Sequence, residues 1–310
     1  MLNWFLIALI APILWSIVNH IDKHLLSRYF EGKGVGAIML FSSLFSAVIL
    51  PIIAFFYHSQ IFNLPFYDLA LLLLVGLISA GAFYFYLRAM DIEEASIVVP
   101  LFQLIPIFGY FLSFLIIGES LSIQQIMYSL LIIAGIAILS VEIDLESNFI
   151  FRKKVLYFVA SSSFLFALHD VLFKKVAVQD TFWVSAFWQY AGLTIFGIFL
   201  FFISQHFRQE FLRMIKGHNL NILSLNIVSE SLYILGNLAN NFATLLAPVA
   251  IVLVVSSYQP LFVFIGGVFL TIFLPKIITE KISHKHLVHK SISILIIIIG
   301  SYLLYSSSQY

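Results

Sequence analysis

Residues 95–117 read ASIVVPLFQLIPIFGYFLSFLII, a run of 23 residues without a charged side chain. A transmembrane helix needs about 20 consecutive, mostly apolar residues, so this run is long enough to cross a bilayer. It also contains two prolines, Pro100 and Pro106. Because proline removes a backbone donor and breaks or kinks a helix, the run predicts a membrane span that is interrupted along its length.

The whole chain has a similar composition. Of its 310 residues 62% are hydrophobic and only 10% are charged. A soluble protein carries about 25% charged residues, so most of this surface must face lipid. Segments that alternate polar and apolar residues, as the strands of an outer-membrane barrel do, are absent. We therefore expect an all-α integral membrane protein.

Ten apolar runs are long enough to span a membrane, and the polar breaks between them are too short for a soluble domain. Nine or eleven spans stay open, because residues 240–260 are apolar with few breaks. No basic residue precedes the first run, so we expect it to be a retained helix and not a cleaved signal peptide. The predicted spans are residues 2–21, 35–57, 68–90, 95–117, 122–142, 154–174, 181–204, 219–242, 247–274 and 287–305.

The chain contains an internal repeat. Ile97-Val98-Val99 and Pro106-Ile107-Phe108 match Ile251-Val252-Leu253 and Pro260-Leu261-Phe262 at a constant offset, and Leu14-Trp15-Ser16 with Asn19 and Lys23 matches Leu165-Phe166-Ala167 with Asp170 and Lys174. These matches keep the same order along the chain. The sequence therefore predicts two related five-helix halves, residues 1–146 and residues 147–310.

The basic residues test this repeat independently. Five is an odd number, so two fused five-helix halves lie in opposite orientations in the membrane. Fourteen of the 16 Lys and Arg residues follow odd-numbered spans, and the basic clusters change parity between the halves. This pattern favours inverted repeats. By the positive-inside rule it predicts a multi-pass protein of the cytoplasmic membrane with both termini extracytoplasmic.

Several segments resemble the EamA-type module of the drug/metabolite transporter superfamily. They are Tyr86-Leu87-Arg88-Ala89-Met90, Ala95–Leu101, Pro106-Ile107-Phe108, Gly118-Glu119 and Ala134–Ile138, with Ala247–Ala250 and Gln259-Pro260-Leu261-Phe262 in the second half. The second half departs from the pattern because no Gly precedes Glu280. The resemblance implies a transporter of small solutes. It also implies cytoplasmic termini, which is the opposite of what the charge count predicts.

The eighth predicted span carries the clearest polar pattern. Asn226, Glu230, Tyr233, Asn237 and Asn241 follow one another at spacings of 4, 3, 4 and 4, which places them on one helical face. Polar groups at membrane depth are tolerated mainly where they face a cavity or a partner. We predict that this face lines a polar cavity, with Glu230 binding substrate or a proton. The alternative is that the Asn residues only bind neighbouring helices.

The first and sixth spans carry further candidates at matching depth, namely Trp15 and Asn19 in one and His169 and Asp170 in the other. A carboxylate beside an imidazole can bind a cationic amine or relay a proton, since His titrates near neutral pH. The alternative is that headgroups or water satisfy these residues close to the interface.

The fourth and ninth spans are broken by proline at corresponding positions, which in transporters is a pointer to the binding site. Their candidate residues are Gln103, Ser256 and Gln259. Prolines that merely kink a helix are the alternative. Tyr84, in the third span, can stack on an aromatic or cationic substrate or belong to the interfacial aromatic belt.

Enzyme signatures are missing from the sequence. It has no Cys, no nucleophile elbow, no phosphate-binding loop and no His-Glu-x-x-His motif. We therefore predict no catalytic residue, no cofactor and no metal site. His284, His286 and His289 lie among lysines, which favours contact with anionic lipid over metal binding. A net charge of +1 gives no indication of a nucleic-acid partner.

These observations predict a secondary transporter that moves small metabolites or amphiphilic, toxic compounds by alternating access. The expected partners are a small-molecule substrate, membrane lipids and protons, with proton coupling through Glu230 assisted by Asp170 or His169. An uncoupled facilitator, a non-transporting scaffold and a membrane enzyme acting on lipid are the alternatives. The enzyme would need the acidic run Glu142, Asp144 and Glu146, which also fits a solvated linker. Substrate, direction of transport and oligomeric state, a monomer included, stay open.

Overall fold

The computed structural model describes residues 4–26, 34–93, 98–99, 101–140, 153–216, 220–273 and 284–307. Within these ranges every regular element is a helix. The elements are α1 (Trp4–His24), α2 (Val35–Phe45), the 3₁₀ helix η2 (Ser46–Val48), α3 (Ile49–Tyr57), α4 (Phe66–Ile92), α6 (Leu104–Ile117), α7 (Ile123–Ser140), α8 (Lys153–Ala177), α9 (Phe182–Ile203), α10 (Gln205–Lys216), α11 (Leu220–Leu246), α12 (Val249–Ser256), α13 (Gln259–Phe273) and α14 (His284–Ser307).

Ten apolar helical stretches in the described residues coincide with the ten predicted runs. Seven are long enough to cross a membrane, and three are shorter. The seven are Trp4–His24, Val35–Tyr57, Phe66–Ile92, Lys153–Ala177, Phe182–Ile203, Leu220–Leu246 and Val249–Gly267; the three are Leu104–Ile117, Ile123–Gly135 and Ile292–Ser307. The prediction of an all-helical protein with several membrane spans is confirmed.

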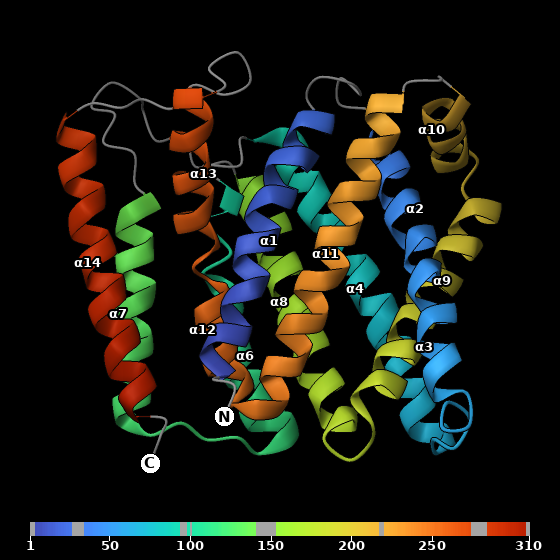
Figure 1. The fold of residues 1–310 in the computed structure, drawn as a ribbon, viewed down its shortest axis with the longest axis horizontal. Helices are drawn as coiled ribbons and strands as arrows, with labels where there is room; N and C mark the ends of the chain where they lie inside the picture. Colours follow the sequence, from blue (N-terminus) through green and yellow to red (C-terminus); the bar gives the residue numbers. More distant parts are fainter. Residues whose placement is uncertain are drawn as a thin grey trace.

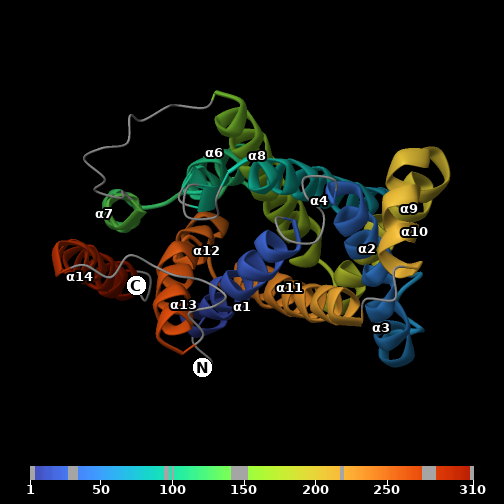
Figure 2. The same cartoon turned by 90° about the horizontal axis from the view of Figure 1, so that it is seen from above.

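The helices stand side by side in two rows. Viewed from above, α4, α6 and α8 form one row, and α1, α11, α12 and α13 form the other (Figure 2). Helix α1 packs along α11, and α4 packs along α8. The pair α7 and α14 lies at one end, and α2, α3, α9 and α10 lie at the other. α1 begins and α14 ends at the lower edge of Figure 1.

Large apolar side chains cover the outside of the molecule. Phe56, Phe202 and Tyr302 are 70%, 71% and 71% exposed. Patches of this kind are rare on soluble monomers and fit contact with lipid tails. The largest buried apolar cluster lies inside, where Leu87 of α4 and Tyr190 of α9 are completely buried.

One helix lies in a segment that the sequence predicts to be a connection between two spans. Helix α10 lies at the upper edge of Figure 1 and is amphipathic, with Phe211 and Met214 buried and Arg213 exposed. The Glu210 carboxylate accepts a hydrogen bond from the Gly36 N–H at 3.1 Å, which attaches α10 to the start of α2. Burial raises the pKa of Glu210, and His206 and the Gly36 N–H oppose that shift. The apolar residues spaced three and four apart in QHFRQEFLRMIK are the signal for this helix.

Two glycines bring α4 and α9 into close contact. A Cβ atom on Gly76 would overlap the backbone of Gln189 and Leu193, and one on Gly192 would overlap the backbone of Leu73. Small residues let membrane helices approach until their backbones touch. This contact holds α9, and with it Gln189, at a fixed depth beside α4 and α8.

We expect Gly76→Ala to destabilise the protein by about 1–3 kcal/mol, because its methyl group meets backbone that cannot rotate away. The measurement is the midpoint of thermal unfolding in detergent. Gly81→Ala, on the same helix, is the matched control, since its Cβ meets only a Leu165 methyl group at 3.3 Å. Equal midpoints for the two variants would contradict this account of the α4–α9 contact.

Candidate functional site

Two helical spans are broken near the middle of the molecule, at positions that the predicted repeat matches to within one residue. Residues 102–103 form a turn before α6, and residues 257–258 form a turn between α12 and α13. At the second break the Leu261 N–H bonds to the Tyr258 carbonyl at 2.9 Å. The Ser257 carbonyl instead accepts a hydrogen bond from Gln103 Nε2 at 3.1 Å. A side chain from one break therefore satisfies a backbone group at the other.

A cavity lies beside these breaks, between the two rows of helices. Six spans line it: α1, α4, the segment leading into α6, α8, α11, and α12 with the start of α13. Its wall includes nine sequence-predicted candidates: Trp15, Asn19, Gln103, His169, Asp170, Tyr233, Asn237, Ser256 and Gln259. The remaining wall is mostly apolar: Val18, Phe83, Tyr86, Val99, Phe102, Ile105, Phe166, Leu253, Ser257 and Pro260.

The other four candidates lie away from the cavity wall. Glu230 is 3% exposed and accepts a hydrogen bond from Ser42 Oγ of α2 at 2.7 Å. Asn226 donates to the Ile222 carbonyl in its own helix at 2.8 Å. Asn241 binds a residue of α9, as described below, and Tyr84 packs edge-on against Phe85. Helix α11 is 27 residues long and contacts α2, α1 and α8. Residues on its one polar face therefore bind to different neighbouring helices.

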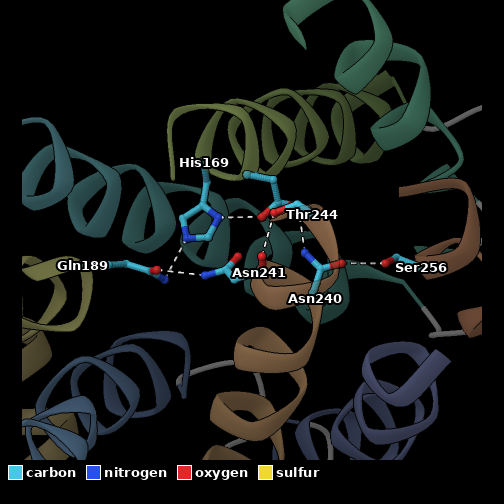
Figure 3. A network of polar contacts seen from close by, with 7 residues as sticks. His169, Gln189, Asn240, Asn241, Thr244 and Ser256 are labelled. Atoms are coloured by element: carbon cyan, nitrogen blue, oxygen red, sulfur yellow. Dashed lines mark hydrogen bonds and ion pairs between the residues drawn. The ribbon is translucent and has the colours of Figure 1, made fainter. Parts of the chain in front are cut away.

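A chain of hydrogen bonds begins at Asn241 of α11, passes through Gln189 of α9 and reaches His169 of α8 at the cavity (Figure 3). Asn241 Nδ2 donates to Gln189 Oε1 at 2.9 Å, and Gln189 Nε2 donates to His169 Nε2 at 2.9 Å. His169 Nε2 is therefore an acceptor, and the neutral ring carries its proton on Nδ1. That nitrogen donates to Asp170 Oδ1 at 2.8 Å.

The chain continues from Asp170 to the broken ninth span. Asn240 Nδ2 donates to Asp170 Oδ2 at 3.1 Å, and Ser256 Oγ donates to Asn240 Oδ1 at 2.8 Å (Figure 3). Asp170 and His169 are 6% and 3% exposed. The carboxylate is thus bound by an imidazole and an amide, and neither carries a fixed positive charge. Asn240 and Gln189 connect α8, α9, α11 and α12 through this one carboxylate.

A second buried carboxylate adjoins the cavity, and the sequence analysis missed it. Asp22 is 1% exposed. It accepts hydrogen bonds from Ser229 Oγ at 2.9 Å and from Tyr86 Oη at 3.2 Å. Tyr86 Oη also lies 2.9 Å from Asn19 Oδ1. The signal was available, because Trp15, Asn19 and Asp22 are spaced by 4 and 3 on one face of α1.

Two lysines contact the ends of other helices at opposite edges of the molecule. At the upper end of α1, Lys23 Nζ donates to the carbonyls of Met90 and Glu93, at 3.0 and 2.9 Å. At the lower end of α8, Lys174 Nζ donates to the Ala247 carbonyl at 2.8 Å and forms an ion pair with Glu119. The Glu119 carboxylate also accepts the Val249 N–H at 2.8 Å, at the start of α12.

Some sequence predictions lie outside the described residues. The acidic run 142–146 and the expected boundary between residues 146 and 147 belong to them, and so do the side chains of His284, His286 and His289. Within the described residues there is no group of three His, Cys, Asp or Glu side chains able to hold a metal ion.

We expect Asn240→Ala to destabilise the protein by about 1–3 kcal/mol, because it leaves Asp170 Oδ2 and Ser256 Oγ buried without a partner. Asn226→Ala is the control on the same helix, since Asn226 bonds to its own backbone and otherwise only to the weak acceptor Met214 Sδ, at 3.8 Å. It should cost about 1 kcal/mol or less. Thermal unfolding in detergent compares the two, and an equal loss of stability in both would show that the network in Figure 3 contributes nothing specific.

Comparison with known proteins shows what the chain is similar to. No curated protein sequence matches it. Among solved structures 28 chains match. One, described only as "Crystal structure of protein", has a TM-score of 0.63 at 13% identity and covers 99% of this chain and 97% of its own, which shows a shared fold. Residues 2–141 match the family model described as "EamA-like transporter family". The protein is therefore a multi-span membrane protein whose residues 2–141 are similar to the EamA-like transporter family.

Proposed function

We propose that the protein is a secondary transporter that carries small metabolites or amphiphilic compounds across the cytoplasmic membrane by alternating access. The observation that carries this proposal is the cavity between the two rows of helices. Three of its six lining spans come from residues 1–146 and three from residues 147–310. A polar site between two halves, beside two broken helices, is the arrangement from which such transporters expose a solute to either side.

The packing of the helices supports two inverted halves. The first span of each half packs on the third span of the other, because α1 contacts α11 and α8 contacts α4. The fifth spans, α7 and α14, pack on each other. A two-fold axis in the membrane plane would produce these pairs. The breaks at residues 102–103 and 257–258 are related in the same way.

The two lysine contacts support the same symmetry. Lys23 and Lys174 are matched in the predicted repeat. Pro106 and Pro260 are matched at an offset of 154 residues, and the same offset matches Glu93 with Ala247. Each lysine donates to the carbonyl of the residue that the repeat assigns to it. One contact lies at the upper edge and the other at the lower edge (Figure 1).

Proton coupling is part of the proposal. His169 and Asp170 line the cavity, and Asp22 and Glu230 each lie about one helical turn from a cavity residue, Asn19 and Tyr233. Ionisable groups inside a membrane protein are characteristic of proton and substrate pathways. If a solute displaces a proton from one of these carboxyl groups when it binds, the solute and the proton would be transported in opposite directions. An uncoupled facilitator is the alternative.

The test is flux into proteoliposomes that contain a pH-sensitive dye, with a panel of small neutral metabolites and amphiphilic amines outside. We expect at least one compound to enter faster than into protein-free liposomes and to change the internal pH. Asp170→Asn and Glu230→Gln should abolish the pH change, and Asn226→Ala should retain it. Entry without any pH change in the wild type would favour the facilitator, and no entry of any compound would contradict transport.

Alternating access requires the contact among Glu119, Lys174 and the start of α12 to open in one state. Glu119→Gln weakens it, so we expect the cavity to become more accessible from the lower edge. The chain has no Cys, so Ser257→Cys provides a single reporter in the cavity. Labelling by a membrane-impermeant maleimide should rise several-fold in the Glu119→Gln background. Asp180→Asn, at the same edge, is the control, and an unchanged labelling rate in Glu119→Gln would contradict the gate.

We also propose that both termini are extracytoplasmic. The start of α1 and the end of α14 lie at the lower edge, whereas α10, with Arg208, Arg213 and Lys216, lies at the upper edge. Fusions at Tyr310 distinguish the orientations. A reporter active only outside the cytoplasm should be active, and one that fluoresces only inside should be dark. The reverse result would contradict this proposal and support cytoplasmic termini, which the family resemblance implies.

A further inference from the structure

Three residues of the cavity wall carry buried hydrogen-bonding atoms that have no partner among the described residues. They are Trp15 Nε1 and Asn19 Nδ2 of α1 and Gln103 Oε1 at the first helix break. The indole nitrogen and the Asn19 amide nitrogen can only donate. Gln103 Nε2 donates to the Ser257 carbonyl, which fixes the orientation of the amide and leaves its oxygen as an acceptor. Helix α1 thus offers two donors to the cavity, and the first helix break offers an acceptor.

Gly236 lets the Trp15 ring lie close against α11. A Cβ atom on this glycine would lie 2.7 Å from Trp15 Nε1 and 3.0 Å from Trp15 Cδ1, so the indole ring occupies the place that a side chain would need. Gly236 is flanked on α11 by Tyr233 and Asn237, which line the cavity. The glycine therefore holds the indole donor at the edge of the cavity.

The charges of the wall restrict what that oxygen belongs to. Neither Lys nor Arg occurs among the described residues that line the cavity, so a carboxylate there would lack a cation. The carboxylate of Asp170 is engaged by His169 and Asn240, and it would repel a second anion. Phe83, Phe102 and other apolar groups form much of the remaining wall and fit an apolar body.

We propose that the cavity binds a neutral solute that carries a carboxamide-like group on an apolar body. Its carbonyl oxygen has two lone pairs and accepts the Trp15 indole N–H and the Asn19 amide N–H, and its own N–H donates to Gln103 Oε1. The solute satisfies all three buried atoms, which a simple amine or a carboxylate cannot do. This inference names the substrate class of the transporter proposed above and rests on that function for its physiological meaning.

The test measures binding to the purified full-length protein by calorimetry with four probes that share one apolar body. The probes are 3-phenylpropanamide, methyl 3-phenylpropanoate, 3-phenylpropanoate and 3-phenylpropylamine. We expect the amide to bind most tightly. The ester keeps the carbonyl but lacks the N–H, so it should bind about tenfold more weakly, and the two charged probes should bind more weakly than the ester.

Two variants connect the binding to the proposed atoms. Trp15→Phe removes the indole N–H and keeps an aromatic ring, and Gly236→Ala displaces the indole, because the added Cβ would overlap the ring. Both should weaken the amide and the ester about tenfold and leave the amine unchanged. Gly266→Ala is the control, because its Cβ meets only the His20 ring, at 3.6 Å or more, and it should bind like the wild type.

Failure to bind the amide, or binding of all four probes with equal affinity, would overturn the proposal. Equal weakening of the amide and the amine by Trp15→Phe would also overturn it, because the loss would then be general. Transport is judged separately by liposome flux. Flux without the predicted amide selectivity rejects only the subsite, and selective binding without flux of any solute rejects only transport.

Discussion

The central constraint on this protein is that a backbone carbonyl freed inside a membrane must find another hydrogen-bond donor, because lipid offers none. The ninth span is broken at residues 257–258, and the freed Ser257 carbonyl is satisfied by Gln103 from the break in the fourth span. The two breaks are therefore held together, and the cavity lies beside them. The polar wall of the cavity follows from the same requirement, since Ser256, Asn240 and Asp170 continue the hydrogen bonding away from the break.

The network around Asp170 shows how a carboxylate can be placed in the interior without a fixed cation. Its oxygens are bound by the His169 imidazole and the Asn240 amide, and the imidazole is in turn oriented by Gln189. Gln189 keeps its position because α9 touches α4 through Gly76 and Gly192. A packing contact between backbones therefore determines which imidazole nitrogen carries the proton. The hydrogen bonds of such a network polarise and position one another, which is why its residues act as a unit.

Sequence patterns predicted the ten apolar segments and nine of the cavity-lining residues, because membrane spans and polar faces have strong periodic signals. They did not separate Asn237, which lines the cavity, from Asn226 and Glu230, which do not, since periodicity gives the face of a helix and not its neighbour at each depth. Asp22 was missed although it shares a face with Asn19. Helix α10 was missed because it is short and polar enough to resemble a connection. The spatial partners of Gln103 and Gln189 come from segments far apart in the chain, which no local pattern specifies.

Lys23 and Lys174 relate the predicted repeat to the proposed mechanism of alternating access. If the halves are inverted copies, Lys23 and Lys174 occupy equivalent positions at opposite edges, and a rocking motion must exchange their environments. The Lys174 contact includes Glu119 and the N-terminus of α12. Glu280, the repeat counterpart of Glu119, lies outside the described residues. An ion pair that is closed at one edge biases the equilibrium toward that state by its interaction free energy, and a solute shifts it only by binding the two states with different affinity. In the proposed transporter such a difference would arise at the cavity beside the paired breaks, because Gln103 and Ser257 belong to different proposed halves and would change their distance if the halves moved.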